Sequence, residues 1–160
     1  MKKVVIAVIL LLASEVYLLA QDSKKTQFTL TAGYAKGLNT FDFENFHGFH
    51  LGFNFNKPQA EGITWDSQFS LNYSSDNEDR LAVTPLGGGR LYFNGSENKY
   101  RFFFNLLAGP ALYHFSGDDY IETRIDIGYA GGFHMTTQKW QCGVSVEAIE
   151  LVVFKLGIHL

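Results

Sequence analysis

Ionisable side chains recur on one face of the segments that have the character of β-strands. They are Asp66, Arg90, Glu122, Arg124, Asp126, Glu147 and Lys155. Successive side chains of a strand point to opposite faces, so residues of one parity share a face. Four acids and three bases nearly cancel, and charges removed from water must pair to be tolerated. The spacing therefore predicts an interior salt-bridge network that opposes free diffusion past it.

Acid–base or nucleophilic catalysis would need a base close to a nucleophile. The residues nearest to that requirement are His114, Ser116, Asp118 and Asp119 at the end of one predicted strand, with His47 and His50 near another. The chain contains no G-x-S-x-G, H-E-x-x-H or phosphate-cradling glycine motif. We interpret the histidines as surface residues at the rim, and we expect no catalytic residue, no cofactor and no metal site.

Eight strands would have to position these charges. The predicted segments are 27–35, 46–56, 63–73, 81–93, 101–114, 121–135, 140–148 and 151–160. No helical period and no apolar stretch of membrane-spanning length follows residue 20. Short connections with turn chemistry, such as Lys57-Pro58 and Asn94-Gly95-Ser96, favour antiparallel neighbours. We predict an all-β, eight-stranded, antiparallel up-and-down barrel.

The face opposite the charges is apolar and rich in aromatic residues, such as Phe28, Trp65, Phe104 and Phe133, and it carries no Lys, Arg, Asp or Glu. An eight-stranded barrel has an interior barely wide enough for side chains, so this bulk would not fit inside. Glycine and small polar residues on the charged face suit a narrow interior. The apolar face is therefore predicted to contact lipid, where a single Arg or Lys near the midplane costs about 2–4 kcal/mol.

The two ends of the sequence are consistent with export. Lys2 and Lys3 precede an apolar run over residues 4–13, and Ala20 precedes Gln21, as in a secretory signal peptide. We assign residues 1–20 to the signal peptide and residues 21–160 to one barrel domain. Removing residues 1–20 changes the formal charge from −3 to −4, because Lys2, Lys3 and Glu15 leave. No basic run exists to neutralise phosphates, so nucleic acid is not an expected partner.

In the last predicted strand, apolar residues alternate with a mixed set of residues up to the final carboxylate. The residues that form its apolar face are Phe154, Leu156, Ile158 and Leu160, and Gly157 lies on the opposite face. This ending resembles the C-terminal signature of bacterial outer-membrane barrels, although Leu160 stands where a terminal aromatic residue is commonest. The resemblance implies that barrel-assembly machinery reads this strand during insertion.

Two internal segments carry a second resemblance. Residues 82–93 contain Pro85 within a strand-like run, and residues 102–110 join an aromatic run to Ala108-Gly109-Pro110. Together they resemble the small outer-membrane β-barrel proteins of OmpX-like and PorT-like type. That resemblance implies an eight-stranded barrel in the outer membrane, with no shared catalytic residue or ligand. PorT-like members are linked to protein secretion and gliding machinery, and we do not expect that role of this chain.

Placing both termini in the periplasm makes the odd-numbered connections face outward. Their acidic residues form an outward acidic rim: Asp42, Glu44, Asp76, Glu78, Asp79, Asp118 and Asp119. Solvated loops explain such a rim, and a sharper hypothesis is that it binds divalent cations shared with lipid A phosphates or repels anionic solutes.

Pro85 and Pro110 are predicted to lie nearly opposite each other on the fourth and fifth strands. Because proline cannot donate to a ladder, we expect a bulge or weakened seam there. It is either a packing kink or a lateral opening for lipid or ligand.

These observations together predict an outer-membrane barrel with a structural or interaction role and a filled lumen, not an open porin. We expect a monomer in contact with the bilayer and lipopolysaccharide. Binding to an unidentified protein partner is a further possibility. A lipid A-modifying barrel enzyme is one alternative. A secreted soluble barrel that binds a small ligand is the other.

Overall fold

The structure is a computed structural model, and it describes residues 26–37, 47–57, 62–75, 78–117, 121–148 and 151–160. The predicted signal peptide lies outside these residues, as do Asp42, Glu44, Asp76, Asp118 and Asp119 of the predicted acidic rim. Within the described ranges, no helix is both long and apolar enough to cross a bilayer.

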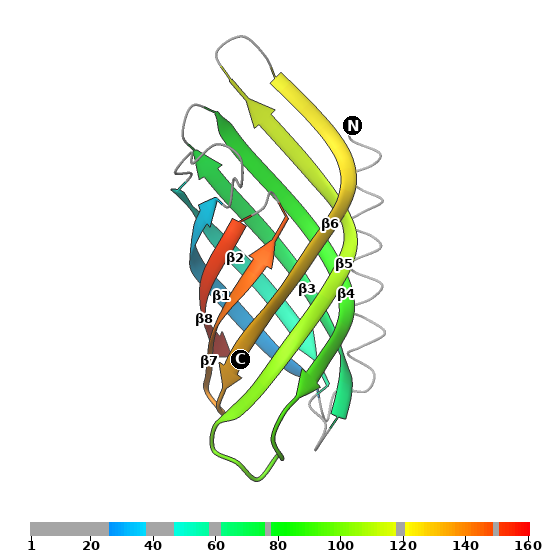
Figure 1. Cartoon of the computed structure of the whole chain (residues 1–160), viewed down its shortest axis with the longest axis vertical. Coiled ribbons are helices and arrows are strands. Elements are labelled where there is room, and N and C mark those ends of the chain that lie inside the picture. Colours follow the sequence, from blue (N-terminus) through cyan, green and yellow to red (C-terminus); the bar gives the residue numbers. More distant parts are fainter. Residues whose placement is uncertain (1–25, 38–46, 58–61, 76–77, 118–120, 149–150) are drawn as a thin grey trace.

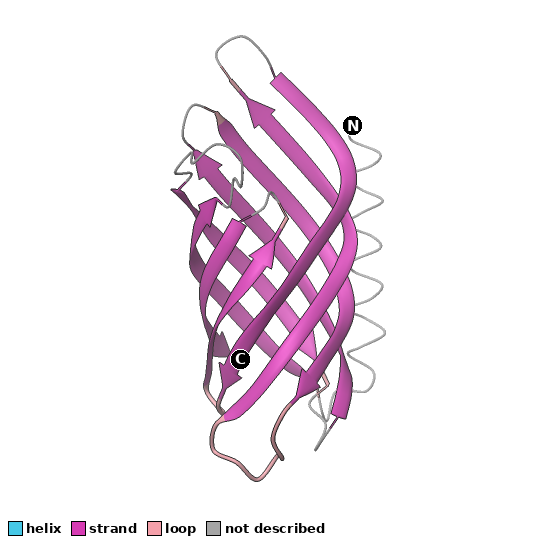
Figure 2. Ribbon diagram, in the orientation of Figure 1, coloured by secondary structure: helices cyan, strands magenta, loops and turns pink. Residues whose placement is uncertain are grey.

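Eight antiparallel strands close into one barrel in chain order, with β1 paired to β8 (Figures 1 and 2). The strands are β1 (Gln27–Gly37), β2 (His47–Asn56), β3 (Gly62–Ser75), β4 (Asp79–Tyr92), β5 (Arg101–Ser116), β6 (Ile121–Thr136), β7 (Trp140–Glu147) and β8 (Leu151–His159). The predicted number, order and direction of the strands are confirmed.

The register sets the width of the barrel. A path along paired residues starts at Gln27, passes through one residue in each of the strands β2 to β8, and returns to β1 at Gly37. The stagger from position 27 to position 37 is ten residues. In an eight-stranded barrel it tilts the strands by roughly 40° and leaves an interior that side chains fill.

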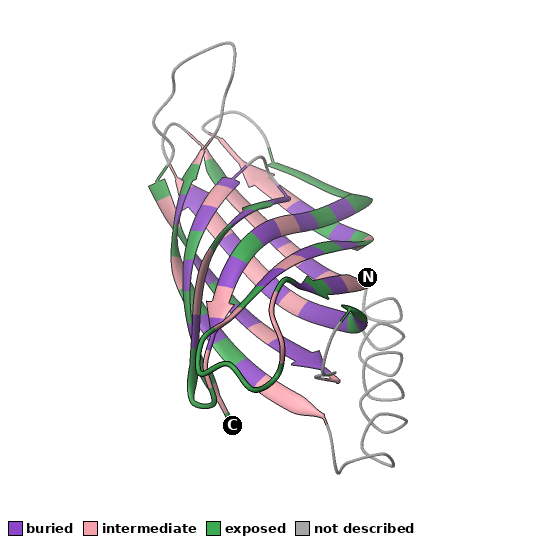
Figure 3. Cartoon of the chain, turned by 60° about the horizontal axis from the view of Figure 1, so that its bottom comes forward, coloured by how far each residue is buried: buried purple, intermediate pink, exposed green. Residues whose placement is uncertain are grey.

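Side chains alternate between the interior, called the lumen below, and the outer surface along the strands, except over the first seven residues of β6, which are all exposed (Figure 3). Inward positions hold buried polar residues, including His50, Gln68 and Asn72. Outward positions hold exposed apolar residues such as Leu106 and Leu156. The predicted assignment of the two faces is therefore confirmed. An apolar interior, as a soluble ligand-binding barrel would need, is not what the described residues form.

The lumen also contains apolar side chains that the prediction of a small polar interior did not include. Phe103, Leu107 and Tyr113 of β5 point inward and are buried, as is Leu86 of β4. Each shares the parity of a polar inward neighbour, such as Asn105. Leu86 and Leu107 pack together with Ala130, and Tyr113 packs with Ala82 and Ala111.

The two ends of the barrel differ in shape. The lower mouth is the end that carries Gln27, Leu160 and the short β4–β5 and β6–β7 turns, and the upper mouth is the opposite end (Figure 1). β5 and β6 have 16 residues each, whereas β7 has 8, so the β5–β6 hairpin projects beyond the upper mouth. Pairing between β6 and β7 ends at Ala130 and Glu147.

The seam between β4 and β5 is interrupted as the sequence predicts. Ladder pairs run to Val83–Leu112 and resume at Gly87–Ala108 without a change of register. Pro85 and Pro110 therefore face each other inside the gap, near the middle of β4. The predicted weakened seam is confirmed, and the unchanged register shows that it is not a bulge.

Candidate functional site

Glu147 is the centre of a buried polar group in the upper half of the lumen, here called the upper cluster (Glu147, Lys155, His50, Asn72 and Gln68). Its carboxylate pairs with the Lys155 ammonium and lies 3.2 Å from His50 Nδ1. It also accepts hydrogen bonds from the side-chain amides of Asn72 at 2.9 Å and Gln68 at 3.2 Å. These groups are buried, so their pairing is what makes the two charges tolerable.

Hydrogen bonding fixes the proton on the His50 ring. Asn72 donates its amide hydrogens to Glu147, so its Oδ1 faces His50 Nδ1, 2.7 Å away. An amide oxygen only accepts, and Nδ1 therefore carries the proton. His50 Nε2 lies 3.1 Å from the Thr31 hydroxyl, within hydrogen-bond distance. Gly52 makes room for this ring, because a Cβ there would lie 2.7 Å from Nε2.

A second buried group, here called the lower cluster, lies nearer the lower mouth and consists of Asp66, Arg90, Asn105, Tyr92 and Phe103. Asp66 and Arg90 form a bidentate pair, with both N–O distances at 3.0 Å. Asn105 donates to Asp66 at 3.3 Å, and Arg90 donates to the Tyr92 hydroxyl at 3.3 Å. The guanidinium lies 3.9 Å from the Phe103 ring centroid, a cation–π contact.

Four of the seven residues predicted for the lumen network are in it: Asp66, Arg90, Glu147 and Lys155. The prediction was wrong for Glu122, Arg124 and Asp126. They have inward parity but lie on the projecting part of β6, where no described strand closes the barrel, and they are exposed. The alternation along a strand shows which face a residue occupies, but it does not show how far along the barrel axis the residue lies.

Residues that the network prediction left out complete the two clusters, and one of them, His50, is fully buried, so its interpretation as a surface residue at the rim was wrong. They are His50, Gln68, Asn72, Tyr92, Asn105 and Phe103. All have the parity of the charged residues, which is the signal that would have found them. A search restricted to Asp, Glu, Lys and Arg misses them.

Several buried polar atoms of the lumen lack a protein partner. Asn54 Oδ1, Asn105 Oδ1, Gln141 Oε1 and both ring nitrogens of His134 have none. His134 stacks on Phe103, with ring centroids 4.9 Å apart, and its ring occupies the space that a Cβ at Gly143 would need. Buried polar groups of this kind usually meet water or a ligand.

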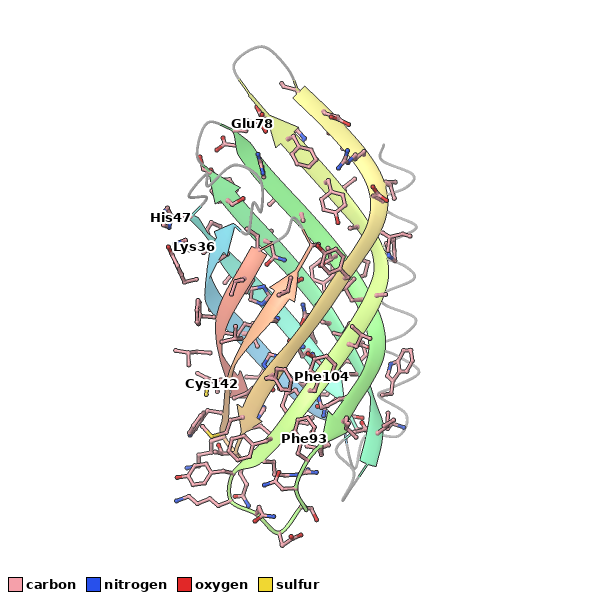
Figure 4. All side chains as sticks on the ribbon, viewed as in Figure 1. Lys36, His47, Glu78, Phe93, Phe104 and Cys142 are labelled. Atoms are coloured by element: carbon pink, nitrogen blue, oxygen red, sulfur yellow. The ribbon has the colours of Figure 1, made fainter. Side chains whose placement is uncertain are left out.

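Only two residues of the predicted acidic rim lie among the described residues (Figure 4, Glu78). Glu78 Oε2 lies 3.6 Å from Arg80 Nη2, and Asp79 accepts a hydrogen bond of 2.7 Å from the Tyr73 hydroxyl. In the described part of the chain, no group of three or more His, Cys, Asp or Glu side chains is arranged to hold a metal ion.

The last strand is placed as its alternation predicts. Phe154, Leu156, Ile158 and Leu160 are exposed on the outer surface, and Gly157 faces Thr29 and Thr31 inside. The Leu160 amide donates to the Phe28 carbonyl at 2.9 Å, so the closing strand is paired to its end. Cys142 is unpaired and half-buried on the same outer surface (Figure 4).

Comparison with known proteins finds likeness in structure alone. No family model and no curated protein matches the chain. Neisserial surface protein A superposes with a TM-score of 0.63 at 9% identity, covering 84% of this chain and 94% of that one. The outer membrane enzyme PagL gives 0.55 at 11%, covering 83% and 97%. The N-terminal barrel domain of Pseudomonas aeruginosa OprF gives 0.50 at 10%, covering 83% and 95%. The chain therefore has the eight-stranded barrel fold found in small outer-membrane proteins.

Proposed function

We propose that this chain is an outer-membrane barrel with a closed lumen, which acts by presenting its β5–β6 hairpin outside the cell and not by conducting solutes. The observation that carries the proposal is the filled interior, because the upper and lower clusters place paired charges and bulky side chains across the lumen.

The outer surface supports residence in a membrane. Among the described strand residues, the outward-facing Asp, Glu, Lys and Arg side chains are Lys36 and Asp79, each near the end of its strand. Both lie near the upper mouth, and below them the outer surface is an apolar band, with Trp65, Phe93 and Trp140 near the lower mouth and Tyr34 and Tyr73 near the upper one. Amphipathic aromatic residues at both borders are typical of barrels in bilayers.

A labelling experiment tests the location and orientation. In a Cys142→Ser background, Glu122→Cys is expected to react with a membrane-impermeant maleimide on intact cells. Lys139→Cys, in the β6–β7 turn, is expected to react only after the outer membrane is permeabilised. Labelling of Lys139→Cys on intact cells would show that the orientation is reversed.

A conductance experiment tests the closed lumen. We expect the purified chain in planar bilayers to give no stepwise current, because the Glu147–Lys155 and Asp66–Arg90 pairs occupy the cross-section. The same preparation should show the mobility change on boiling that folded barrels give, which excludes misfolding as the reason. Reproducible ion-conducting steps from folded protein would overturn the closed lumen.

The projecting hairpin supports a role in binding. The Ile127 amide donates to the Asp126 carboxylate at 2.8 Å, and the Tyr129 carbonyl accepts from Ala148 at 2.9 Å, so odd-numbered residues direct their backbone groups away from β5. Ile121, Thr123 and Ile125 therefore present donors and acceptors along an edge that no described strand covers. Such an edge is a template for an extended segment of another protein.

A single backbone donor offers a specific test of that edge. Peptides selected from a random display library against the chain in nanodiscs should lose binding to Ile125→Pro, because proline removes an edge donor without disturbing the β5 ladder. Ile125→Val is the matched control and should keep binding. Selected peptides that bind both variants equally would show that the edge is not the binding element.

The enzyme alternative has one described contact in its favour. His114 Nδ1 lies 2.8 Å from Thr123 Oγ1 on the outer surface, and the two residues are a directly opposed cross-strand pair. We do not adopt this alternative, since such pairs commonly stabilise sheets. An unchanged lipid A mass spectrum on overexpression is expected. A mass change abolished by His114→Ala would favour the enzyme.

A further inference from the structure

The lower mouth of the barrel contains a cavity of about 780 Å³ that the proposed function does not use. It lies between the β4–β5 turn, the β6–β7 turn and the start of β1. Its walls include Tyr92, Lys99, Tyr100, Arg101, Lys139 and Trp140. The volume is in the range of small-ligand sites, which run from about 300 to 1,000 Å³.

Positive charge dominates this cavity. Lys99, Arg101 and Lys139 contribute three positive charges, and Glu97 is the one acidic residue among its lining residues. Glu97 is turned back into its own turn, where Asn98 Nδ2 donates to its carboxylate at 3.0 Å and its side chain covers Gly95. An anionic group would therefore meet a net positive surface here.

Aromatic rings form the flat walls. The Arg101 guanidinium lies 3.7 Å from the Tyr92 ring centroid, and the Tyr92 hydroxyl accepts a hydrogen bond from Asn56 at 3.2 Å, which fixes the ring. Trp140 and Tyr100 line the cavity with rings that are partly exposed. Exposed aromatic rings next to cations suit a ligand that has both an apolar ring face and a charge.

Two buried residues with unpartnered polar atoms, Gln141 and His134, do not line the cavity themselves but lie next to Thr136, which does. Thr136 lines the cavity, and Gln141 is paired with it across the β6–β7 ladder. Gln141 is buried and its Oε1 has no donor, and His134, the next inward residue above Thr136, has no partner on either nitrogen. A ligand with hydroxyl or amide donors would satisfy acceptors at this depth.

We propose that this cavity binds an acidic saccharide. Its carboxylate or phosphate group would lie against Lys99, Arg101 and Lys139, its ring against Trp140 and Tyr100, and its hydroxyl groups toward Thr136 and Gln141. The inference does not depend on the closed lumen or on the β6 edge. The source of the sugar would be cell-wall glycan if this mouth is periplasmic, and the glycolipid of the outer leaflet if it is not.

Trp140 provides a direct readout. In a Trp65→Phe background it is the remaining tryptophan of the chain, so its fluorescence in neutral-lipid nanodiscs reports on the cavity wall. We expect trigalacturonate to change the emission in a saturable way. Maltotriose, which lacks charge, and triglutamate, which lacks sugar, should each bind at least about tenfold more weakly.

Charge variants and two further probes complete the test. Lys99→Gln with Lys139→Gln lies in surface turns and should lower affinity for trigalacturonate about tenfold, while Lys36→Gln at the opposite end is the matched control and should leave it unchanged. A carboxylated cell-wall disaccharide and a phosphorylated glucosamine disaccharide distinguish the two sources. No saturable change with any acidic sugar, equal binding of triglutamate, or equal affinity of the double variant would overturn the proposal.

Discussion

Pro85 of β4 lies opposite Pro110 of β5, and both lack the backbone donor that the seam between their strands requires. Pro85 keeps its pairing with Phe69 of β3, and Pro110 keeps its pairing with Ile127 of β6. Each proline nitrogen therefore faces the other strand. A hydrogen-bonded antiparallel pair exchanges two N–H···O bonds, and this pair makes neither.

The strands nevertheless stay close at this point. A Cβ added at Gly109 would collide with the carbonyl oxygen of Pro85, so the backbone of β5 packs against β4. This close approach favours a packing kink over a lateral opening.

Restoring the two donors should strengthen the seam. We expect Pro85→Ala with Pro110→Ala to slow hydrogen exchange at the flanking amides of Gly87 and Leu112. Two added hydrogen bonds at about 0.5–1.5 kcal/mol each should raise the free energy of unfolding by about 1–3 kcal/mol. Urea titration in lipid vesicles measures the second effect. Val83→Ala, which changes no backbone donor, should leave exchange unchanged, and unchanged exchange in the double variant would refute this account.

Glu147 should be far more important for stability than Glu122, although the sequence alone placed both in one network. We expect Glu147→Gln to lower the free energy of unfolding by about 3–5 kcal/mol, because it leaves Lys155 charged and buried without its anion. Glu122→Gln, on the exposed hairpin, should change it by less than about 0.5 kcal/mol. Adding Lys155→Met to Glu147→Gln should recover part of the loss. Equal effects of the two Glu variants in urea titration would show that the upper cluster is not a coupled pair.

The contrast between those two residues marks how far the sequence could predict the site. Alternation in each strand fixes whether a residue faces the lumen, and Glu147 and Glu122 both do. Their heights depend on strand pairing, which is a property of the whole barrel. β7 ends at Glu147 while β6 continues to Ile121, so Glu122 has no wall opposite it among the described strands. The inward positions of the Tyr92 and Phe103 rings were predictable from parity. A search for charged residues alone does not find them.

Arg90 should not be replaceable by lysine. Its guanidinium makes two parallel bonds to Asp66 and lies over the Phe103 ring, and an ammonium group cannot do both. We expect Arg90→Lys to lower the free energy of unfolding by about 2–3 kcal/mol, from the lost charge-assisted bond and ring contact. Arg124→Lys is the matched control, because Arg124 is exposed on the hairpin and 5.2 Å from the Phe115 ring centroid. If Arg90→Lys lowers the free energy of unfolding by less than about 0.5 kcal/mol, the paired bonds of the guanidinium to Asp66 do not contribute to stability.

The height of the hydrophobic band can be measured with one substitution made at two outward positions. Leu106 and Ile121 are 65% and 75% exposed, but Leu106 lies in the middle of the apolar band and Ile121 lies at the tip of the projecting hairpin. In vesicles, Leu106→Arg should lower the free energy of unfolding by about 2–4 kcal/mol, the cost of arginine near a bilayer midplane, whereas Ile121→Arg should cost about 0–1 kcal/mol. The difference should vanish in a detergent micelle that adapts to the protein surface. If both arginines cost the same in vesicles, the hairpin lies within the bilayer, and the edge of β6 is not available to an external partner.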